Sequence, residues 1–380
     1  MLLAVCAIPF IYYALALYST RRFFGAANKA RNPVEFPPLS NLKPIRGLDP
    51  GAYENFASLC QQDYPAEYEL IFCVGDANDP ALEVIERLQK AFPETQIRVL
   101  YGAGVAAPND KCAKLARMVK EAKYETIVIN DSDVRVQPDY FRRCIAALSK
   151  PGVAGVTCLY ASTEEVTLAD KLQTVGMISD FFPSLFVAQQ LDGVKFALGT
   201  TIATTRSRIM AFGGYESIMH RPGDDLLVGR ALSEQGTVEL LDYTIETVPD
   251  FSSIGALYAK RLRWLTVMRH MRPWGHLGLI FTQGIFWSIA AALIRPSLPV
   301  ALSFLGVYLG MRIAMMGLVG ISGMKLTRMR SLLWMIPIWD ALAFILWVHS
   351  FISRTIRWRQ RDYRIREGNL VPIAAEDLST

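Results

Sequence analysis

The first twenty residues of this 380-residue chain contain no charged side chain, and Arg21 and Arg22 follow directly. At about 1.5 Å per helical residue, an apolar stretch of this length crosses roughly 30 Å of hydrocarbon. A cleavable secretory signal carries its positive charge before the apolar core, whereas here the charge follows it. A buried amphipathic helix, the alternative, would repeat a polar face at helical spacing, and no such face repeats. We therefore predict that residues 1–20 form a transmembrane anchor.

Positive charge after this anchor predicts its orientation. Arg21, Arg22, Lys29 and Arg31 follow the apolar stretch within a few residues. Basic residues that flank a span are usually retained on the cytoplasmic side of the membrane. We expect residues 21–38 to be a basic juxtamembrane linker that leads into a cytoplasmic domain.

Three further apolar stretches occur in the C-terminal third, at residues 277–294, 298–324 and 331–352. The basic turn between the last two and the basic residues that end the chain both favour the cytoplasmic side. Four complete spans would place the end of the chain on the opposite side, so we expect one of the three stretches to be interfacial or re-entrant. We predict a C-terminal membrane region over residues 273–353 and a basic tail over residues 354–380.

Two charged side chains, Arg312 and Asp340, interrupt the last two apolar stretches. A charge within the hydrocarbon is costly unless it faces protein or water. Because the two charges have opposite signs, we expect them to pair across neighbouring helices. The alternative is that they line a pocket for a lipid head group.

Composition limits the partners of the chain. Hydrophobic residues make up 52% of it and charged residues 20%, and the apolar excess lies at the two ends. The formal net charge is only +5 at pH 7, and much of it comes from six arginines near the C-terminus. These are Arg354, Arg357, Arg359, Arg361, Arg364 and Arg366. Basic residues beside a membrane span meet anionic lipid head groups, so we predict no nucleic-acid partner.

The six cysteines include no CxxC pair, and there are four histidines. Neither residue type shows zinc-ligand spacing, so we expect no dedicated zinc site. Scattered cysteines of this kind are typically buried, reduced and structural, which is consistent with a cytosolic middle domain.

Between residue 39 and about residue 271, short apolar runs alternate with helical patterns. The predicted strands are residues 69–74, 97–100, 126–130, 155–160 and 238–241, and the predicted helices are residues 80–92 and 111–122. Strands that alternate with helices imply an α/β fold with a mostly parallel, Rossmann-like sheet. Ligands bind beyond the carboxyl ends of such strands. Asp76 and Asp131 fall at two of these ends.

Asp131 and Asp133 directly follow a buried apolar strand. Two carboxylates two residues apart at a strand end can converge on Mg²⁺ or Mn²⁺, with diphosphate oxygens and water completing the coordination. Such a cation neutralises charge on a departing phosphate, as transfer from a nucleotide sugar requires. A turn without a ligand is the alternative, and the position after a buried strand favours the metal site.

Asp224 and Asp225 precede an apolar helical pattern. As an N-cap and a first-turn acid, the two would stabilise the start of a helix. A carboxylate fixed at a helix start is also well placed as a general base for an acceptor hydroxyl. The two roles are compatible.

Lys260, Arg263 and Trp264 belong to a basic stretch that ends at Arg272. Arginine makes bidentate contacts with phosphate, and tryptophan stacks on rings or anchors at the membrane interface. On its own, a cluster of this kind is typical of a juxtamembrane segment that contacts lipid head groups.

The order of these blocks resembles the ceramide glucosyltransferases and their bacterial relatives, which are inverting enzymes of glycosyltransferase families 21 and 2. The resemblance runs through residues 42–47, 62–65, 73–80, 131–136, 213–214, 224–225 and 263–264. It covers most of the chain between residues 39 and 272, together with a similar arrangement of spans. It implies a cytoplasmic GT-A catalytic domain over residues 39–272, anchored by N- and C-terminal transmembrane helices.

The resemblance also implies roles for particular residues. Asp225 would be the catalytic base, with Asp224 in support. Asp131 and Asp133 would hold the metal and the diphosphate. The residues implied to contact the nucleotide sugar are Lys43, Asp76, Asp79, Lys111, Asp131, Lys260, Arg263 and Trp264.

Two departures from the family pattern bear on specificity. Lys260 occupies the first position of the (Q/R)xxRW motif, so only the positive charge is kept. Residues 178–190 lack the histidine-containing stretch expected of animal ceramide enzymes, which leaves the acceptor open. The chain is at least as similar to a bacterial subfamily that acts in hopanoid biosynthesis, with an N-acetylhexosamine donor and a triterpenoid polyol acceptor.

We predict transfer of a hexose, glucose in the first instance, from a UDP-sugar to the primary hydroxyl of a lipid such as ceramide. The enzyme would use Mg²⁺ or Mn²⁺ at the cytoplasmic face of a bacterial inner membrane. A hopanoid N-acetylglucosaminyltransferase is the alternative. Two further alternatives are a processive polysaccharide synthase, disfavoured by Lys260 and the few spans, and a non-catalytic membrane scaffold, disfavoured because all the aspartates are present.

Overall fold

The computed structural model describes residues 2–26, 35–162, 164–249, 251–358 and 361–373. Lys29, Arg31 and Arg359, which contributed to the predictions on orientation and on the tail, lie outside these residues. The chain forms two compact units. The first comprises Met1–Ala27, Glu165–Asp192 and Phe251–Thr380, and the second comprises Asn28–Glu164 and Gly193–Asp250.

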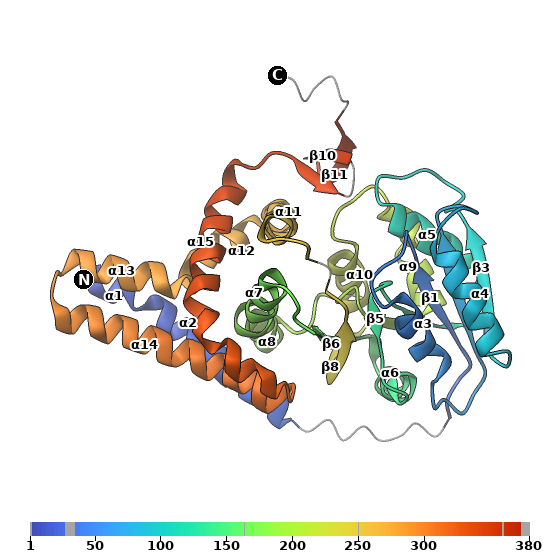
Figure 1. Ribbon diagram of the computed structural model, residues 1–380, viewed down its shortest axis with the longest axis horizontal. Helices are drawn as coiled ribbons and strands as arrows, with labels where there is room; N and C mark the ends of the chain where they lie inside the picture. Colours follow the sequence, from blue (N-terminus) through green and yellow to red (C-terminus); the bar gives the residue numbers. More distant parts are fainter. Residues whose placement is uncertain (1, 27–34, 163, 250, 359–360, 374–380) are drawn as a thin grey trace. The chain divides into compact units, whose positions relative to one another are not determined.

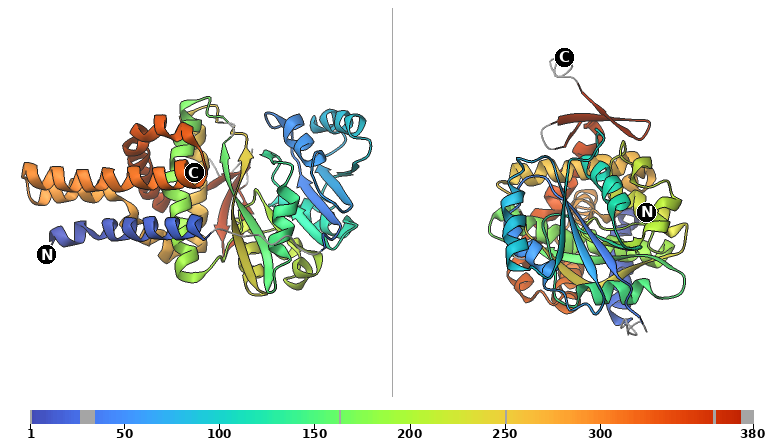
Figure 2. Two further views of the ribbon diagram at one scale, coloured as in Figure 1. Left: turned by 90° about the horizontal axis from the view of Figure 1, so that it is seen from below. Right: turned by 90° about the vertical axis from the view of Figure 1, so that its right-hand side faces the viewer.

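The second unit is built on an eight-stranded sheet with the order β3-β2-β1-β4-β7-β6-β8-β5. Its strands are β1 Leu39–Pro44, β2 Tyr68–Val74, β3 Gln96–Tyr101, β4 Thr126–Ile129, β5 Val134–Arg135, β6 Val153–Ser162, β7 Ile202–Thr205 and β8 Thr237–Thr247. Only β7 and β5 run against their neighbours, so the predicted mostly parallel sheet is confirmed. Figure 2 shows its twist.

Helices cover this sheet as crossover connections. They are α3 Ala52–Cys60, α4 Ala81–Ala91, α5 Asp110–Glu121, α6 Tyr140–Leu148, α9 Arg206–Ala211, the short η2 Tyr215–Ser217 and α10 Asp224–Ser233. In α4 the residues at helical spacing, Val84, Ile85 and Leu88, are buried. They join a core that includes Phe72 and Phe141, which is the burial that an amphipathic pattern predicts.

The central strand β1 was not among the predicted strands, because its sequence is polar. Ser40, Asn41 and Lys43 are all buried in it. The Ser40 hydroxyl donates to Glu69 Oε1 at 2.6 Å, and the Asn41 amide donates to Asn130 Oδ1 at 2.7 Å. Partners on neighbouring segments thus offset the cost of burying these groups.

The first unit is almost entirely helical. Its elements are α1 Leu2–Cys6, α2 Ile8–Gly25, α7 Leu168–Gly176, η1 Met177–Phe181, α8 Phe182–Asp192, α11 Ile254–Met271, α12 Pro273–Gly278, η3 Leu279–Thr282, α13 Gly284–Ile294, α14 Leu298–Met316, η4 Gly317–Gly323, η5 Thr327–Met335, α15 Ile336–Ile352, β9 Ile356–Trp358, β10 Arg361–Arg366 and β11 Asn369–Pro372. Helix α14 packs against α2 and α13 (Figure 1). Strands β9 to β11 form a small antiparallel sheet within the predicted tail.

The two compact units are defined by packing, whereas the predicted domains were defined by function. Residues 165–192 and 251–271 belong to the unit that contains the terminal helices. The compact sheet unit is therefore smaller than the catalytic domain predicted over residues 39–272. The functional boundaries of the domains stay a prediction.

Among the residues that the structure describes, three helical segments are long and apolar enough to cross a membrane, namely Leu2–Gly25, Leu298–Gly323 and Thr327–Ile352. Pro273–Thr282 and Gly284–Ile294 meet at a bend of 57° and reach the length of a span only together. The expected departure from a simple span therefore occurs in the first of the three C-terminal stretches.

The predicted ion pair between Arg312 and Asp340 is confirmed. Arg312 Nε donates to Asp340 Oδ2 at 2.8 Å, and Arg312 Nη2 donates to Asp340 Oδ1. The Tyr308 hydroxyl donates to the same carboxylate at 2.8 Å. Arg312 also donates to the backbone carbonyl and the hydroxyl of Ser179. This buried network joins α14, α15 and η1.

We predict that Asp340→Ala lowers the free energy of unfolding by about 3–5 kcal/mol, because it leaves a buried guanidinium without its carboxylate. The measurement is the midpoint of thermal unfolding of the purified protein in detergent.

The matched control is the double variant Arg312→Met/Asp340→Leu, which removes both charges and keeps apolar volume. It should recover most of the lost stability, since apolar replacement of a buried ion pair is often close to neutral. A double variant as unstable as the single one would show that the charge imbalance is not the cause.

Candidate functional site

The carboxyl ends of β1, β2 and β4 meet at one edge of the sheet. The three strands are parallel neighbours, with Leu42 opposite Ile129 and Pro44 opposite Cys73. Asp131 and Asp133 follow β4, and Asp76 and Asp79 follow β2, as the sequence predicted. The parallel register therefore brings both pairs of aspartates to the same edge.

One lysine connects the predicted metal site to the predicted catalytic helix. Lys111 Nζ, in the first turn of α5, lies 2.6 Å from Asp131 Oδ1 and 3.2 Å from Asp224 Oδ2. Burial alone would lower the pKa of Lys111, but the carboxylates of Asp131 and Asp224 raise it well above its usual value. The lysine is therefore a fixed positive charge between two carboxylates.

A glycine makes room for this contact. A Cβ atom at Gly199 would lie 3.0 Å from Asp131 Oδ2 and 3.2 Å from Lys111 Nζ. A side chain here would press on both members of the ion pair. Gly199 was not among the predicted site residues, and nothing in its sequence context pointed to it.

The starts of α5 and α10 are held together by Asn109. Its side chain caps α5 by accepting from the Cys112 N–H at 3.2 Å. Its amide donates to the Arg221 carbonyl at 3.3 Å, and its own N–H donates to the Met219 carbonyl. The cap therefore ties the loop before Asp224 to the helix that carries Lys111. An asparagine directly before a helical pattern is a readable N-cap signal, but its contact with this loop is tertiary.

Asp225 lies in the first turn of α10 and is partly buried. Gly223, with φ 69°, is the N-cap of this helix, so the predicted capping role of Asp224 is wrong, and both acids lie in the first turn. The carboxylate of Asp225 accepts from the Leu226 N–H at 2.8 Å. Burial raises the pKa of Asp225 to about 6, and the nearby charge of Asp224 adds to the rise while Lys111 opposes it.

A second glycine positions this helix. A Cβ atom at Gly229 would lie 2.0 Å from the Phe196 carbonyl carbon and 2.1 Å from the Ala197 nitrogen. Only glycine permits this backbone approach, at which the Ala197 N–H donates to the Asp225 carbonyl at 3.3 Å. The position of Asp225 therefore depends on the absence of a side chain one turn further along α10.

Lys43 lies beneath the loop that carries Asp131 and Asp133. It is 1% exposed, and its ammonium donates to the Asp131 carbonyl at 2.8 Å. Burial lowers the pKa of Lys43 to about 8, although Asp133, Asp131 and Asp49 oppose this shift. Its contacts here are with the backbone of the loop. A contact with the nucleotide sugar stays a prediction.

Asp79 organises the end of β2. Its carboxylate accepts from the backbone N–H groups of Gly47, Gly75 and Ala81 at 3.1–3.3 Å. Burial alone would raise the pKa of Asp79, but these hydrogen bonds hold it below its usual value. Asp76 accepts from the Asn78 N–H at 2.7 Å and is exposed.

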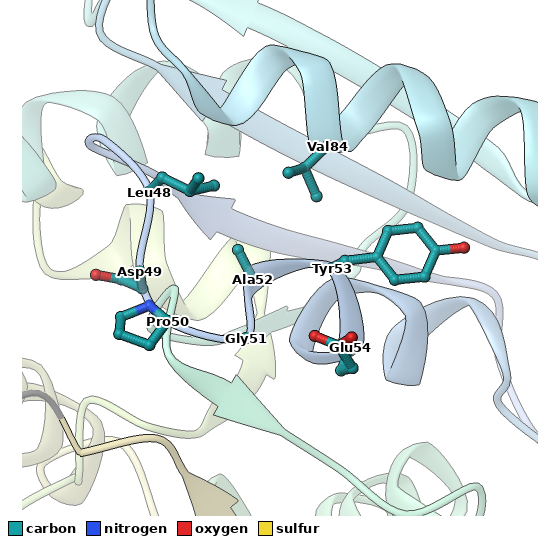
Figure 3. A pocket seen from close by; sticks show the side chains of 8 residues that line it. All are labelled: Leu48, Asp49, Pro50, Gly51, Ala52, Tyr53, Glu54 and Val84. Atoms are coloured by element: carbon teal, nitrogen blue, oxygen red, sulfur yellow. The ribbon is translucent and has the colours of Figure 1, made fainter.

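An open hollow of about 450 Å³ lies just beyond β1, beside the loop that Asp79 holds (Figure 3). It is lined by Leu48, Asp49, Pro50, Gly51, Ala52, Tyr53, Glu54 and Val84. Its apolar walls and its place at the sheet edge make it a suitable surface for the flat face of a nucleotide base.

Lys260, Arg263 and Trp264 lie on α11, in the helical unit. The Lys260 ammonium lies 5.5 Å from the Trp264 ring centroid. Arg261 stacks between two indoles, 5.0 Å from the ring of Trp264 and 4.8 Å from that of Trp339. Cations at these distances are attracted to the ring faces. Arg261, which the sequence analysis did not single out, thus fixes the indole of the motif.

The donor set after β4 fits a hard divalent cation. In the part of the chain that the structure describes, no group of three or more His, Cys, Asp or Glu side chains is arranged to hold a metal. Asp131 and Asp133 would supply carboxylate oxygens and leave most coordination positions open. Magnesium and similar cations bind in this way when substrate phosphates and water complete the shell.

The family model of glycosyl transferase family 21 matches residues 1–371. The sheet is the GT-A type found in many nucleotide-sugar-dependent transferases. The chain therefore belongs to glycosyl transferase family 21.

Two relatives of known name agree with this assignment. Ceramide glucosyltransferase 1 of Caenorhabditis elegans is 23% identical over 267 residues, which is 66% of this chain and 55% of that protein. Ceramide glucosyltransferase of Komagataella phaffii is 33% identical over 159 residues, or 39% of this chain and 31% of that protein. The chain thus aligns with about half or less of these relatives. A mannosyltransferase from Pyrobaculum calidifontis, in complex with GDP-Man and Mn2+, shares the fold with a TM-score of 0.57 at 17% identity, covering 90% of this chain and 99% of that one.

We predict that Gly229→Ala lowers the free energy of unfolding by about 1–3 kcal/mol, because the new methyl group meets backbone atoms that no rotamer change can move. Thermal unfolding of the purified protein gives the result. The matched control is Gly306→Ala in α14, where a Cβ would meet nothing within 4 Å. Since alanine favours a helix over glycine, the control should be neutral or slightly stabilising. Equal stability of the two variants would contradict the close approach.

Proposed function

We propose that this protein is a membrane-bound, inverting glycosyltransferase that moves a hexose from a UDP-sugar to the primary hydroxyl of a lipid. One observation carries the proposal: a single lysine, Lys111, joins Asp131 of the DxD sequence to the Asp224–Asp225 pair at the ligand-binding edge of a GT-A sheet. Membership of family 21 and the presence of helices of membrane-spanning length support it.

The donor side needs positive charge, because a nucleoside diphosphate leaves. Lys111 supplies one fixed cation at the site. Asp131 and Asp133 would hold Mg²⁺ or Mn²⁺, which when bound supplies further neutralisation of the diphosphate. The GDP-Man and Mn2+ in the mannosyltransferase complex support this assignment for the fold. The hollow beyond β1 would bind the base of the nucleotide. Asp79 would hold the neighbouring loop through its hydrogen bond from the Gly47 N–H.

The acceptor side needs a base, because a neutral hydroxyl is a weak nucleophile. Asp225 takes the hydroxyl proton as the oxygen attacks the anomeric carbon. The new bond forms from oxygen to that carbon as the bond to the diphosphate breaks on the opposite side. A single displacement inverts the centre, so an α-linked donor gives a β-glycoside, and the proton remains on Asp225.

The surroundings of Asp225 suit this role. A carboxylate with a pKa near 6 is a stronger base than an ordinary aspartate but is still ionised at neutral pH. Asp224 in the same turn contributes to the raised pKa of Asp225, and Lys111 Nζ lies 3.2 Å from Asp224 Oδ2. Arg263 and Trp264 on α11 would complete the donor and acceptor contacts, as the family motif implies.

The relatives named as ceramide glucosyltransferases favour ceramide as acceptor and glucose as the sugar. A hopanoid polyol with an N-acetylglucosamine donor is the alternative. Arg21 and Arg22, after the first apolar helix, favour a cytoplasmic site at a bacterial inner membrane.

A product assay on the purified protein tests this function. UDP-glucose and UDP-N-acetylglucosamine are each offered with ceramide and with a hopanoid polyol in the presence of Mg²⁺. We expect glucosylceramide, and a 10²–10⁴-fold lower rate for Asp225→Asn, since loss of a general base typically costs that much.

The matched control is Asp242→Asn, at an exposed aspartate in β8, which should keep the wild-type rate. A hopanoid product would keep the mechanism and change the substrates. Absence of transfer to any lipid, or a long polysaccharide product, would refute the proposed function.

The pH dependence follows from the pKa of Asp225. The base must be ionised, so the rate should fall about tenfold per pH unit below a pKa near 6. Asp224→Asn removes a neighbouring negative charge and should move this acidic limb to lower pH. Initial rates between pH 4.5 and 8 give the profile. An acidic limb near pH 4, the usual range of an aspartate, would contradict the assignment.

A further inference from the structure

The small C-terminal sheet has one covered side. Its strands β9, β10 and β11 are antiparallel, with Tyr363 opposite Ile356 and Ile365 opposite Leu370. Successive side chains of a strand point to opposite sides of the sheet, and residues paired across two strands point to the same side. Ile356, Tyr363 and Leu370 are buried, and β9 contacts α11. This side of the sheet therefore packs on the helical unit.

The other side of the sheet carries exposed arginines. Arg357 follows the buried residue of β9, and Arg364 and Arg366 alternate with the inward-facing residues of β10. All three side chains are exposed, and across the described ranges of the chain none of their guanidinium groups makes an ion pair or a hydrogen bond. Asp362, opposite Arg357, is the acid on this side. We call the surface formed by Arg357, Arg364 and Arg366 the arginine face.

The chain holds this sheet close to a segment of membrane-spanning length. That segment is Thr327–Ile352, and β9 begins after three further residues. Figure 1 shows β10 and β11 following α15. Since a chain covers at most about 3.6 Å per residue, β9 starts within roughly 14 Å of the end of the segment. Arg269 of α11 also fixes the connection, because it donates to the Ser350 carbonyl and, at 2.7 Å, to the Ser353 carbonyl.

An unpaired positive surface at this place matches the chemistry of anionic lipid head groups. Guanidinium groups make bidentate hydrogen bonds with phosphate. A basic residue close to an anionic bilayer strengthens association about fivefold, and this attraction falls off within a Debye length of the surface. An acidic protein would offer similar charges, but it would have to bind from solution. The bilayer, by contrast, is held beside the sheet by the chain itself, which raises its effective concentration.

We propose that the arginine face is a docking surface for anionic phospholipids of the membrane in which the chain lies. The inference rests on the proposed function only for the statement that the protein is membrane-bound. The sequence predicted contact between the whole basic tail and anionic lipids, whereas the fold assigns it to three arginines. Arg361 is exposed but lies on the other side of β10. Because β9 contacts α11, the docked sheet also holds α11 close to the membrane surface.

The experiment places a probe on the arginine face. Val371→Cys puts one reactive thiol opposite Arg364, and the six native cysteines are buried. The labelled protein is reconstituted in nanodiscs of phosphatidylcholine, with or without phosphatidylglycerol, that carry a quencher on the lipid head groups. We expect stronger quenching of the probe when phosphatidylglycerol is present. The increase should disappear at high salt, because salt screens the attraction.

Substitutions show whether the arginines cause this response. Each glutamine on the arginine face should lower the docking equilibrium constant about fivefold, so Arg357→Gln/Arg364→Gln/Arg366→Gln should lose the dependence on phosphatidylglycerol. The corresponding variant with three lysines keeps the charge and should retain it. The matched single variants are Arg364→Gln and Arg361→Gln, on opposite sides of β10, and only the first should weaken quenching. All these side chains are exposed, so the unfolding midpoints in detergent should equal that of the wild type.

Equal quenching with and without phosphatidylglycerol would refute the docking surface. Undiminished quenching of the triple glutamine variant would refute it as well. A response to soluble glycerol phosphate or to poly-glutamate in detergent, with none to phosphatidylglycerol in nanodiscs, would assign the face to a small anion or an acidic protein instead. No sugar donor is present, so these outcomes leave the proposed transferase untouched. A wild-type protein that docks but forms no glycolipid would refute only the transferase.

Discussion

The ammonium group of Lys111 holds together the two halves of the charged edge. Asp131 and Asp224 come from segments far apart in sequence, and without a cation between them their like charges would repel. The lysine between them offsets this repulsion and ties the start of the helix that carries Asp225 to the loop after β4. The cluster still has more negative than positive charge. That excess, added to burial, raises the pKa of Asp225.

Much of the sheet could be predicted from the sequence because several of its strands are apolar runs, two of which, β2 and β4, are followed by aspartates. The strand β1 could not, since its buried serine, asparagine and lysine look like surface residues until their partners on β2 and β4 are known. The C-terminal sheet was also missed. Buried Ile356, Tyr363 and Leu370 lie in segments whose exposed arginines dominate the composition, so the charge masked a pattern of alternate burial.

Some residues of the candidate site could also be predicted from the sequence, and others could not. Asp131, Asp133 and Asp225 were predicted because each stands where a strand ends or a helix begins. The residues that position them were not, since Gly199 and Gly229 act by leaving space for particular distant atoms. Sequence spacing reports local geometry, whereas a close approach between distant backbones appears only in three dimensions.

The bend between η3 and α13 gives the first helix of the chain a role beyond attachment. At this break the Tyr13 hydroxyl donates to the Thr282 carbonyl at 2.8 Å and accepts from the Gly284 N–H at 3.0 Å. Where a helix breaks, some backbone N–H and C=O groups lose their partners within the helix. Hydrocarbon contains no water to replace these partners, so another segment must form the hydrogen bonds. Helix α2 provides that group from the opposite end of the sequence. An apolar helix of equal length from another protein would still enter the bilayer, but without Tyr13 it would leave the Thr282 carbonyl and the Gly284 N–H without this hydrogen-bond partner.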